Sequence, residues 1–177
     1  MNSNSRYYHD SDCDCDPCGK EKKDCFKKEK KEVCPTIIKC SNPGAVTIPT
    51  ATIVGTTFTP TSLTLNTSCL CNPCAKIEFT SNIVATAFTG SISFQIFKQC
   101  VNQFTPVPVG PAFTYSRAVA VTDSDTFTFF ICDCDSCFND CCTYTVVVTV
   151  NAVTVGVLAI NNATLGAIAT CCSNSCC

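Results

Sequence analysis

Apolar side chains alternate with threonine and other polar side chains through most of the chain between residues 44 and 170. Ile92, Phe94 and Ile96, for example, are separated by serine and glutamine. A period of two residues is typical of strands with one buried face and one polar face. Prolines, glycines and Asn/Asp-containing turns separate the alternating segments. The pattern predicts roughly nine short strands and no helix in this region, with separate strands over 83–89 and 91–98 and a long loop over 104–111.

Short strands at even spacing favour an all-β, antiparallel β-sandwich, with a jelly roll preferred over an immunoglobulin-like fold. The turn Asn42-Pro43-Gly44 marks the predicted start of this domain. We predict an extended, polar, cysteine-bearing N-terminal connector tail over residues 1–43, a sandwich over 44–170 and a cysteine-rich C-terminal tail over 171–177. The predicted core face consists of Ile77, Phe79, Ile92, Phe94, Ile96, Phe113, Tyr115, Phe127, Phe129, Val146, Val148 and Val150.

A second pattern, C-x-C-x-x-C, occurs three times. Its copies are Cys13/Cys15/Cys18, Cys69/Cys71/Cys74 and Cys132/Cys134/Cys137, and doubled cysteines stand at Cys141-Cys142, Cys171-Cys172 and Cys176-Cys177. Residues i and i+2 of a strand lie roughly 6.6 Å apart, at the outer limit of disulfide geometry, so each C-x-C pair is better placed to reach two partners elsewhere. The C-x-x-C halves flank turn-forming residues, so these thiols could instead close locally or hold a metal ion.

A disulfide framework is the interpretation that we favour. Cysteine makes up 19 of the 177 residues, and 46% of the residues are hydrophobic, enough for a real core. A chain of this size does not need so many disulfides to fold, so some thiols should serve another purpose. The odd count leaves at least one thiol free, bound to metal or bonded to another chain. The alternative thiolate metal site is Cys132, Cys134, Cys137 and Cys141.

No enzyme signature is visible, and we expect no catalytic residues and no cofactor. Phosphate-binding glycine loops, G-x-S-x-G and H-E-x-x-H are absent, and His9 is the single histidine. The polar start lacks the apolar segment of a signal peptide, and no run of ~18 apolar residues predicts a membrane span. Lysine and glutamate interleave over 20–32, which indicates a solvated face rather than a nucleic-acid patch.

The strand-rich domain, the cysteine-bearing N-terminal extension, the doubled cysteines and the missing signal peptide together resemble subunits of endospore appendages. These are fibres on the spores of Bacillus- and Clostridium-type bacteria, and exosporium and coat proteins are a looser match. The resemblance implies a jelly-roll subunit whose connector thiols, here Cys13, Cys15 and Cys18, bond to an earlier subunit, with sheets joined edge to edge. The triplets inside the domain are more similar to a clostridial domain family of unknown function.

We therefore expect a structural subunit that assembles into a fibre or layer on the spore surface, made in the cytoplasm without a signal peptide. Its expected partners are copies of itself and other spore-surface proteins, without nucleic acid or membrane. The predicted intermolecular thiols are Cys13, Cys15, Cys18, Cys171, Cys172, Cys176 and Cys177; other disulfide candidates are Cys69, Cys71, Cys74, Cys132, Cys134, Cys137, Cys141 and Cys142. The alternatives are a thiolate metal-binding module and an adhesion or carbohydrate-binding module, the latter weakened by the absence of tryptophan.

Overall fold

The computed structural model describes residues 34–70, 72–101, 103–134 and 141–171, and over these ranges the chain forms strands and turns without a helix. Consequently, none of the described residues belongs to a helix able to cross a membrane. The strands are β1 (Ile37–Cys40), β2 (Gly44–Ile48), β3 (Thr57–Asn66), β4 (Pro73–Cys100), β5 (Val107–Asp133) and β6 (Cys141–Cys171). All of their pairings are antiparallel, which confirms the predicted fold class.

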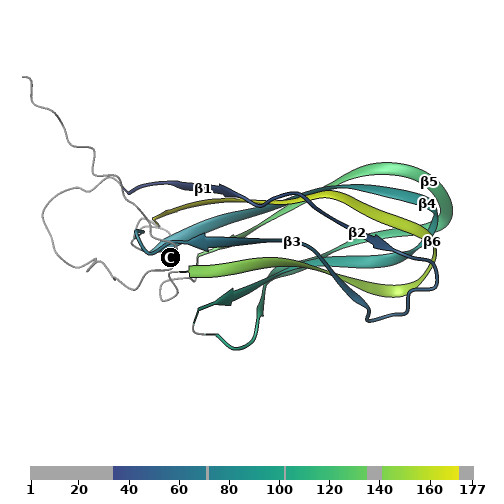
Figure 1. The fold of residues 1–177 in the computed structure, drawn as a ribbon, viewed down its shortest axis with the longest axis horizontal. Helices are drawn as coiled ribbons and strands as arrows, with labels where there is room; N and C mark the ends of the chain where they lie inside the picture. Colours follow the sequence, from purple (N-terminus) through teal and green to yellow (C-terminus); the bar gives the residue numbers. More distant parts are fainter. Residues whose placement is uncertain (1–33, 71, 102, 135–140, 172–177) are drawn as a thin grey trace, which may run out of the picture.

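Three of the strands are far longer than the usual five or six residues, because each one folds back on itself. β4, β5 and β6 contain 28, 27 and 31 residues. Within β4, the rings of Phe79 and Phe94 lie 5.6 Å apart, and within β5 the rings of Phe113 and Phe129 stack at 4.3 Å. Such contacts within one strand require its two halves to face each other. Figure 1 shows the bends gathered at one end of the elongated molecule.

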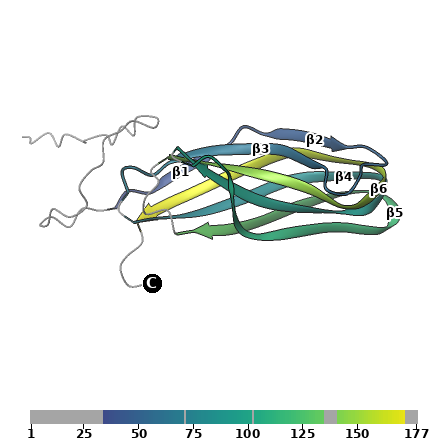
Figure 2. The ribbon, with the colours of Figure 1, turned by 90° about the horizontal axis from the view of Figure 1, so that it is seen from below.

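The pairing register distributes these halves over two layers. In the first layer, β1 and β2 pair with the second half of β6. This half of β6 pairs with the first half of β4, which in turn pairs with the second half of β5. In the second, β3, the first half of β6, the second half of β4 and the first half of β5 follow one another. Viewed from below, β2 and β3 lie along one side and β5 along the other (Figure 2). This order is compatible with the jelly roll, which stays a prediction.

Several predicted boundaries differ from the observed ones. The segments 83–89 and 91–98, predicted as separate strands, are continuous in β4, because the turn between them is a bend with Ala87 and Gly90 at positive φ. The predicted loop 104–111 instead leads into β5. Pro108 and Pro111 are tolerated there because β5 is an edge strand, where a missing N–H breaks few ladder hydrogen bonds.

The N-terminal limit of the domain also differs from the prediction. β1 lies inside the segment predicted as tail, yet it pairs with β6 from Ile37 opposite Ala169 to Cys40 opposite Gly166. The predicted core agrees more closely with the structure, because strand alternation alone determines which side chains point inward. Ten of its twelve residues are buried, and Phe113 and Phe127 are partly buried against the same cluster.

Candidate functional site

Three disulfides whose cysteines both lie within the described ranges close the end of the sandwich opposite the bends. They join Cys34 to Cys171, Cys74 to Cys134, and Cys100 to Cys142. Each one links neighbouring strands at their ends: Ala75 stands opposite Asp133, for example, which brings the preceding Cys74 beside the following Cys134. The second and third triplets are therefore bonded to each other, rather than each closing its own C-x-x-C turn.

Cys171 requires a second correction. It was predicted to reach a neighbouring subunit, but it bonds to Cys34 of its own chain because the end of β6 lies beside the chain entering β1. The alternative metal site also loses ligands, since Cys134 and Cys141 are both disulfide-bonded. Among the described residues, no group of three or more Cys, His, Asp or Glu side chains is placed to hold a metal ion.

The remaining predicted thiols divide into two groups. Cys69 is half-buried in the turn before β4, and Cys142 is buried in its disulfide with Cys100. The predicted residues that fall outside the described ranges are Cys13, Cys15, Cys18, Cys71, Cys137, Cys172, Cys176 and Cys177. Sequence reasoning had not singled out Cys34, Cys40 or Cys100. Cys100 could have been identified from the sequence, because this residue continues the inward-facing row of β4.

Two thiols, Cys40 and Cys132, are exposed and have no disulfide partner within the described part of the chain. Cys40 ends β1 and Cys132 lies near the end of β5, at opposite edges of the first layer. Three strand spacings separate them, roughly 14 Å, whereas disulfide-bonded Cα atoms lie within about 7 Å. The two thiols therefore cannot bond to each other within one folded chain.

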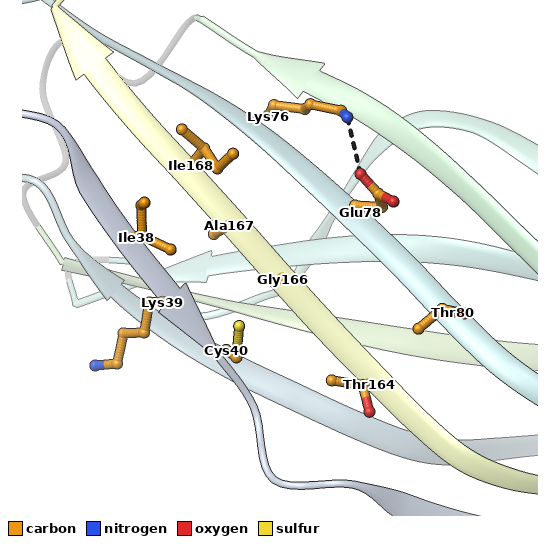
Figure 3. A pocket seen from close by; sticks show the side chains of 10 residues that line it. All are labelled: Ile38, Lys39, Cys40, Lys76, Glu78, Thr80, Thr164, Gly166, Ala167 and Ile168. Atoms are coloured by element: carbon orange, nitrogen blue, oxygen red, sulfur yellow. Dashed lines mark hydrogen bonds and ion pairs between the residues drawn. The ribbon is translucent and has the colours of Figure 1, made fainter.

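Cys40 lies beside an apolar hollow of about 300 Å³ on the outer face of this layer. The hollow forms over Gly166, which pairs with Cys40 on one side and Glu78 on the other and has no side chain to fill the space. Figure 3 shows the Cys40 sulfur next to Gly166, with Ile38 and Ile168 along one rim. Ile38 is 73% exposed and Ile168 is 48% exposed. The outer face is thus apolar next to an exposed thiol.

A charged cluster stabilises the bend of β5 at the other end of the molecule. Asp125 accepts hydrogen bonds from the Tyr115 hydroxyl at 2.9 Å and from the Arg117 guanidinium. Arg117 also lies 3.7 Å from Asp123. These contacts join the two halves of β5. Burial, together with the hydrogen bond to Asp125, raises the pKa of Tyr115 to about 12.

This shift predicts a loss of stability in alkali. The unfolded chain ionises its tyrosines near the usual pKa of about 10, whereas folded Tyr115 holds its proton longer. Its contribution is therefore fully present below pH 10 and is lost as the pH rises from about 10 through about 12. Tyrosinate absorbance, recorded against pH for the native protein and for Tyr115→Phe, should differ by one late-titrating group. Superimposable curves after allowance for one tyrosine of ordinary pKa would contradict this assignment.

Comparison with known proteins gives one family and several remote structural likenesses. A search of curated proteins finds no match. Two structures of infectious bursal disease virus, the Gt and Gx strains, align with TM-scores of 0.46 and 0.44 at 11% and 9% identity, covering 75% and 88% of this chain. The chain spans only 33% and 42% of those two viral chains. A carbohydrate-binding module of the β-sandwich superfamily aligns with a TM-score of 0.33 at 12% identity, with 72% of this chain and 55% of that one covered.

Likeness at this level does not extend to function. The family match is more extensive: the model of a Domain of unknown function (DUF4489) matches residues 34–170. These residues run from Cys34, before β1, to the residue before Cys171. They include β1 to β5, all of β6 except its last residue, and both cysteines of two of the three disulfides. The chain therefore belongs to the DUF4489 family.

Proposed function

We propose that this protein is a structural subunit that assembles with copies of itself into a fibre or layer on the spore surface, cross-linked by disulfides between subunits. The observation that carries the proposal is the placement of Cys40 and Cys132, two exposed thiols on opposite edge strands of one layer. Three disulfides already close the sandwich, so these two thiols are not needed to hold it together.

The edges themselves support assembly. An edge strand presents unpaired backbone N–H and C=O groups, which can pair with an edge of another chain. When the β1 edge of one copy meets the β5 edge of the next, Cys40 and Cys132 come from different copies. Such a contact joins unlike surfaces, so it repeats from copy to copy and generates an open chain of subunits when the rotation between copies does not close a ring. Contact between like edges would instead end at a dimer.

The outer face gives a further reason to expect contact between subunits. Phe130 of β5 is 59% exposed, and the ammonium group of Lys76 lies 4.8 Å from the centre of its ring. With Ile38 and Ile168 this places three large apolar side chains beside the two thiols. Apolar surface of this kind is stabilised when another subunit covers it. The resemblance to spore appendages supports the location of the assembly.

The test is electrophoresis of oxidised protein, with thiols blocked at lysis, run with and without reductant. We expect a ladder that collapses to a single band of 18.9 kDa on reduction. Replacing Cys40 and Cys132 together by serine should remove the long species, and replacing Cys13, Cys15 and Cys18 should show whether the N-terminal thiols add further links.

The matched control replaces the buried pair Cys100 and Cys142, which should destabilise the domain but leave the ladder in place. Monomeric native protein in both lanes would contradict the proposal. A ladder that persists without Cys40 and Cys132 would show that other cysteines form the cross-links, and the proposal would lose its main support.

A further inference from the structure

Lys98 and Asp133 form a buried ion pair that none of the preceding functions uses. The Lys98 Nζ lies 2.7 Å from the Asp133 Oδ2, and the two side chains are 7% and 5% exposed. Lys98 belongs to the inward-facing row of the second half of β4, after Phe94 and Ile96. Asp133 ends the second half of β5, in the other layer. The pair therefore spans the two layers.

Burial makes the charged state of this pair expensive. Each ion loses its hydration, and the desolvation penalty of a buried pair can exceed the attraction between its charges. Transfer of one proton from the ammonium group to the carboxylate removes both charges and leaves an amine facing a carboxylic acid. A neutral amine is a nucleophile, whereas an ammonium ion is not. Condensation of the two groups requires the amine and the carboxylic acid.

A third group acts on the same carboxyl oxygen. The Tyr144 hydroxyl donates a hydrogen bond to the Asp133 Oδ2 at 2.7 Å. Tyr144 stands opposite Lys98 in the ladder between β4 and β6. Burial and Asp133 raise the pKa of Tyr144 above its usual range, so the phenol remains a donor. A donor at this oxygen draws electron density from the carboxyl carbon and stabilises the oxygen as it departs.

We propose that Lys98 and Asp133 condense into an intramolecular isopeptide bond. After the proton transfer, Nζ attacks the carboxyl carbon of Asp133 and forms a tetrahedral intermediate. Nζ then gives up a second proton to the departing oxygen, the bond from carbon to that oxygen breaks, and one water leaves. The ammonium and carboxylate groups are thereby converted into one amide and one water, with charge balanced and no oxidant required. Tyr144 acts as a positioning and polarising residue.

The geometry supplies the proximity that the reaction lacks in water. Two groups held in contact by a folded scaffold react with effective molarities on the order of 10⁵–10⁸ M. The amide also removes a buried ion pair, so desolvation favours the product. The three disulfides link neighbouring strands within a layer, whereas this bond would join the first layer to the second at the same end of the sandwich. It would also survive reduction.

The experiment is intact-mass spectrometry of the full chain after complete reduction and alkylation. We expect a mass about 18 Da below that of the sequence with every cysteine alkylated, the loss of one water, and a branched peptide containing Lys98 and Asp133 after proteolysis. Native protein of full mass would overturn the proposal. Lys98→Arg keeps the charge pair but removes the nucleophile, and we expect it to restore the full mass. A water loss that persists in Lys98→Arg would place the dehydration elsewhere and also overturn the proposal.

Two further measurements test whether bond formation depends on Tyr144 and on burial, rather than on the short distance alone. Tyr144→Phe should slow the appearance of the lighter species during refolding without changing its final identity; an unchanged rate would remove Tyr144 from the mechanism. Lys76 and Glu78 provide an internal control, since they are 2.8 Å apart, as close as the buried pair, but about half exposed. Their peptide should remain linear. A cross-link there would mean that distance alone suffices and would overturn the role assigned to burial.

Discussion

Replacing Gly156 by alanine is expected to destabilise the domain by about 3 kcal/mol or more. Gly156 lies at the bend of β6 with φ at +75°, a conformation that alanine adopts only with strain. An added Cβ would also lie 2.2 Å from the carbonyl oxygen of Ala87 and 2.5 Å from that of Thr86. Both oxygens belong to the bend of β4, so the bends would have to separate. Denaturant unfolding under oxidising conditions measures the loss.

Two other glycines separate the two parts of this effect. Gly55 has φ at +86° with no atom near its added Cβ, so Gly55→Ala reports backbone strain alone. Gly166 has open space and no positive φ, so Gly166→Ala should have little effect on stability. The expected order of destabilisation is Gly156, then Gly55, then Gly166. A Gly156→Ala variant no less stable than Gly55→Ala would show that the bends do not rely on this close contact.

Replacing Cys34 and Cys171 together by serine is expected to reduce the free energy of unfolding by about 4–5 kcal/mol. This disulfide spans 137 residues of sequence, against 60 and 42 for the other two. Cross-linking restricts the unfolded chain more when the closed loop is longer, although the other disulfides lie inside this loop and shorten it. The variant also loses the attachment of the start of β1 to the end of β6. Thermal and denaturant unfolding in the absence of reductant measure the change.

The variant for comparison replaces both Cys100 and Cys142, whose disulfide closes the shortest of the three loops. It should lose about 1 kcal/mol less than the Cys34 and Cys171 variant on loop length alone. Both variants should retain the alternating strands, since the core that determines them is unchanged. A Cys34 and Cys171 variant as stable as the native protein would indicate that the ends of β1 and β6 are held together by packing alone.

Strand alternation predicted the buried faces because it depends only on neighbouring residues. The same rule places Lys98 in the row of Ile92, Phe94 and Ile96, so a buried lysine was already visible in the sequence. The inward-facing row was predicted, but the partner of the Lys98 ammonium group was not. Asp133 is two residues beyond Ile131 in the inward-facing row of β5, so alternation also predicts a buried carboxylate that could pair with Lys98.

The disulfide pairing, in contrast, could not be predicted from spacing. Cys74 meets Cys134 because two strands that are distant in sequence end side by side, and strand order is not written in any local pattern. The bends were missed for a related reason. A bend within a strand and a turn between two strands both favour glycine and positive φ, and only the continued ladder distinguishes them.

The bond between Cys34 and Cys171 has a mechanical consequence. The described strands lie almost entirely between these two cysteines, so the bond bridges the entrance and the exit of the domain. Tension applied to the chain before Cys34 and after Cys171 passes through one pair of sulfur atoms rather than through the hydrogen-bonded ladder. Units linked to one another through the segments before Cys34 and after Cys171 would bear load through this covalent bond, and their strands would not be pulled apart. Reduction of that bond would transfer the load to the folded strands and make the material extensible.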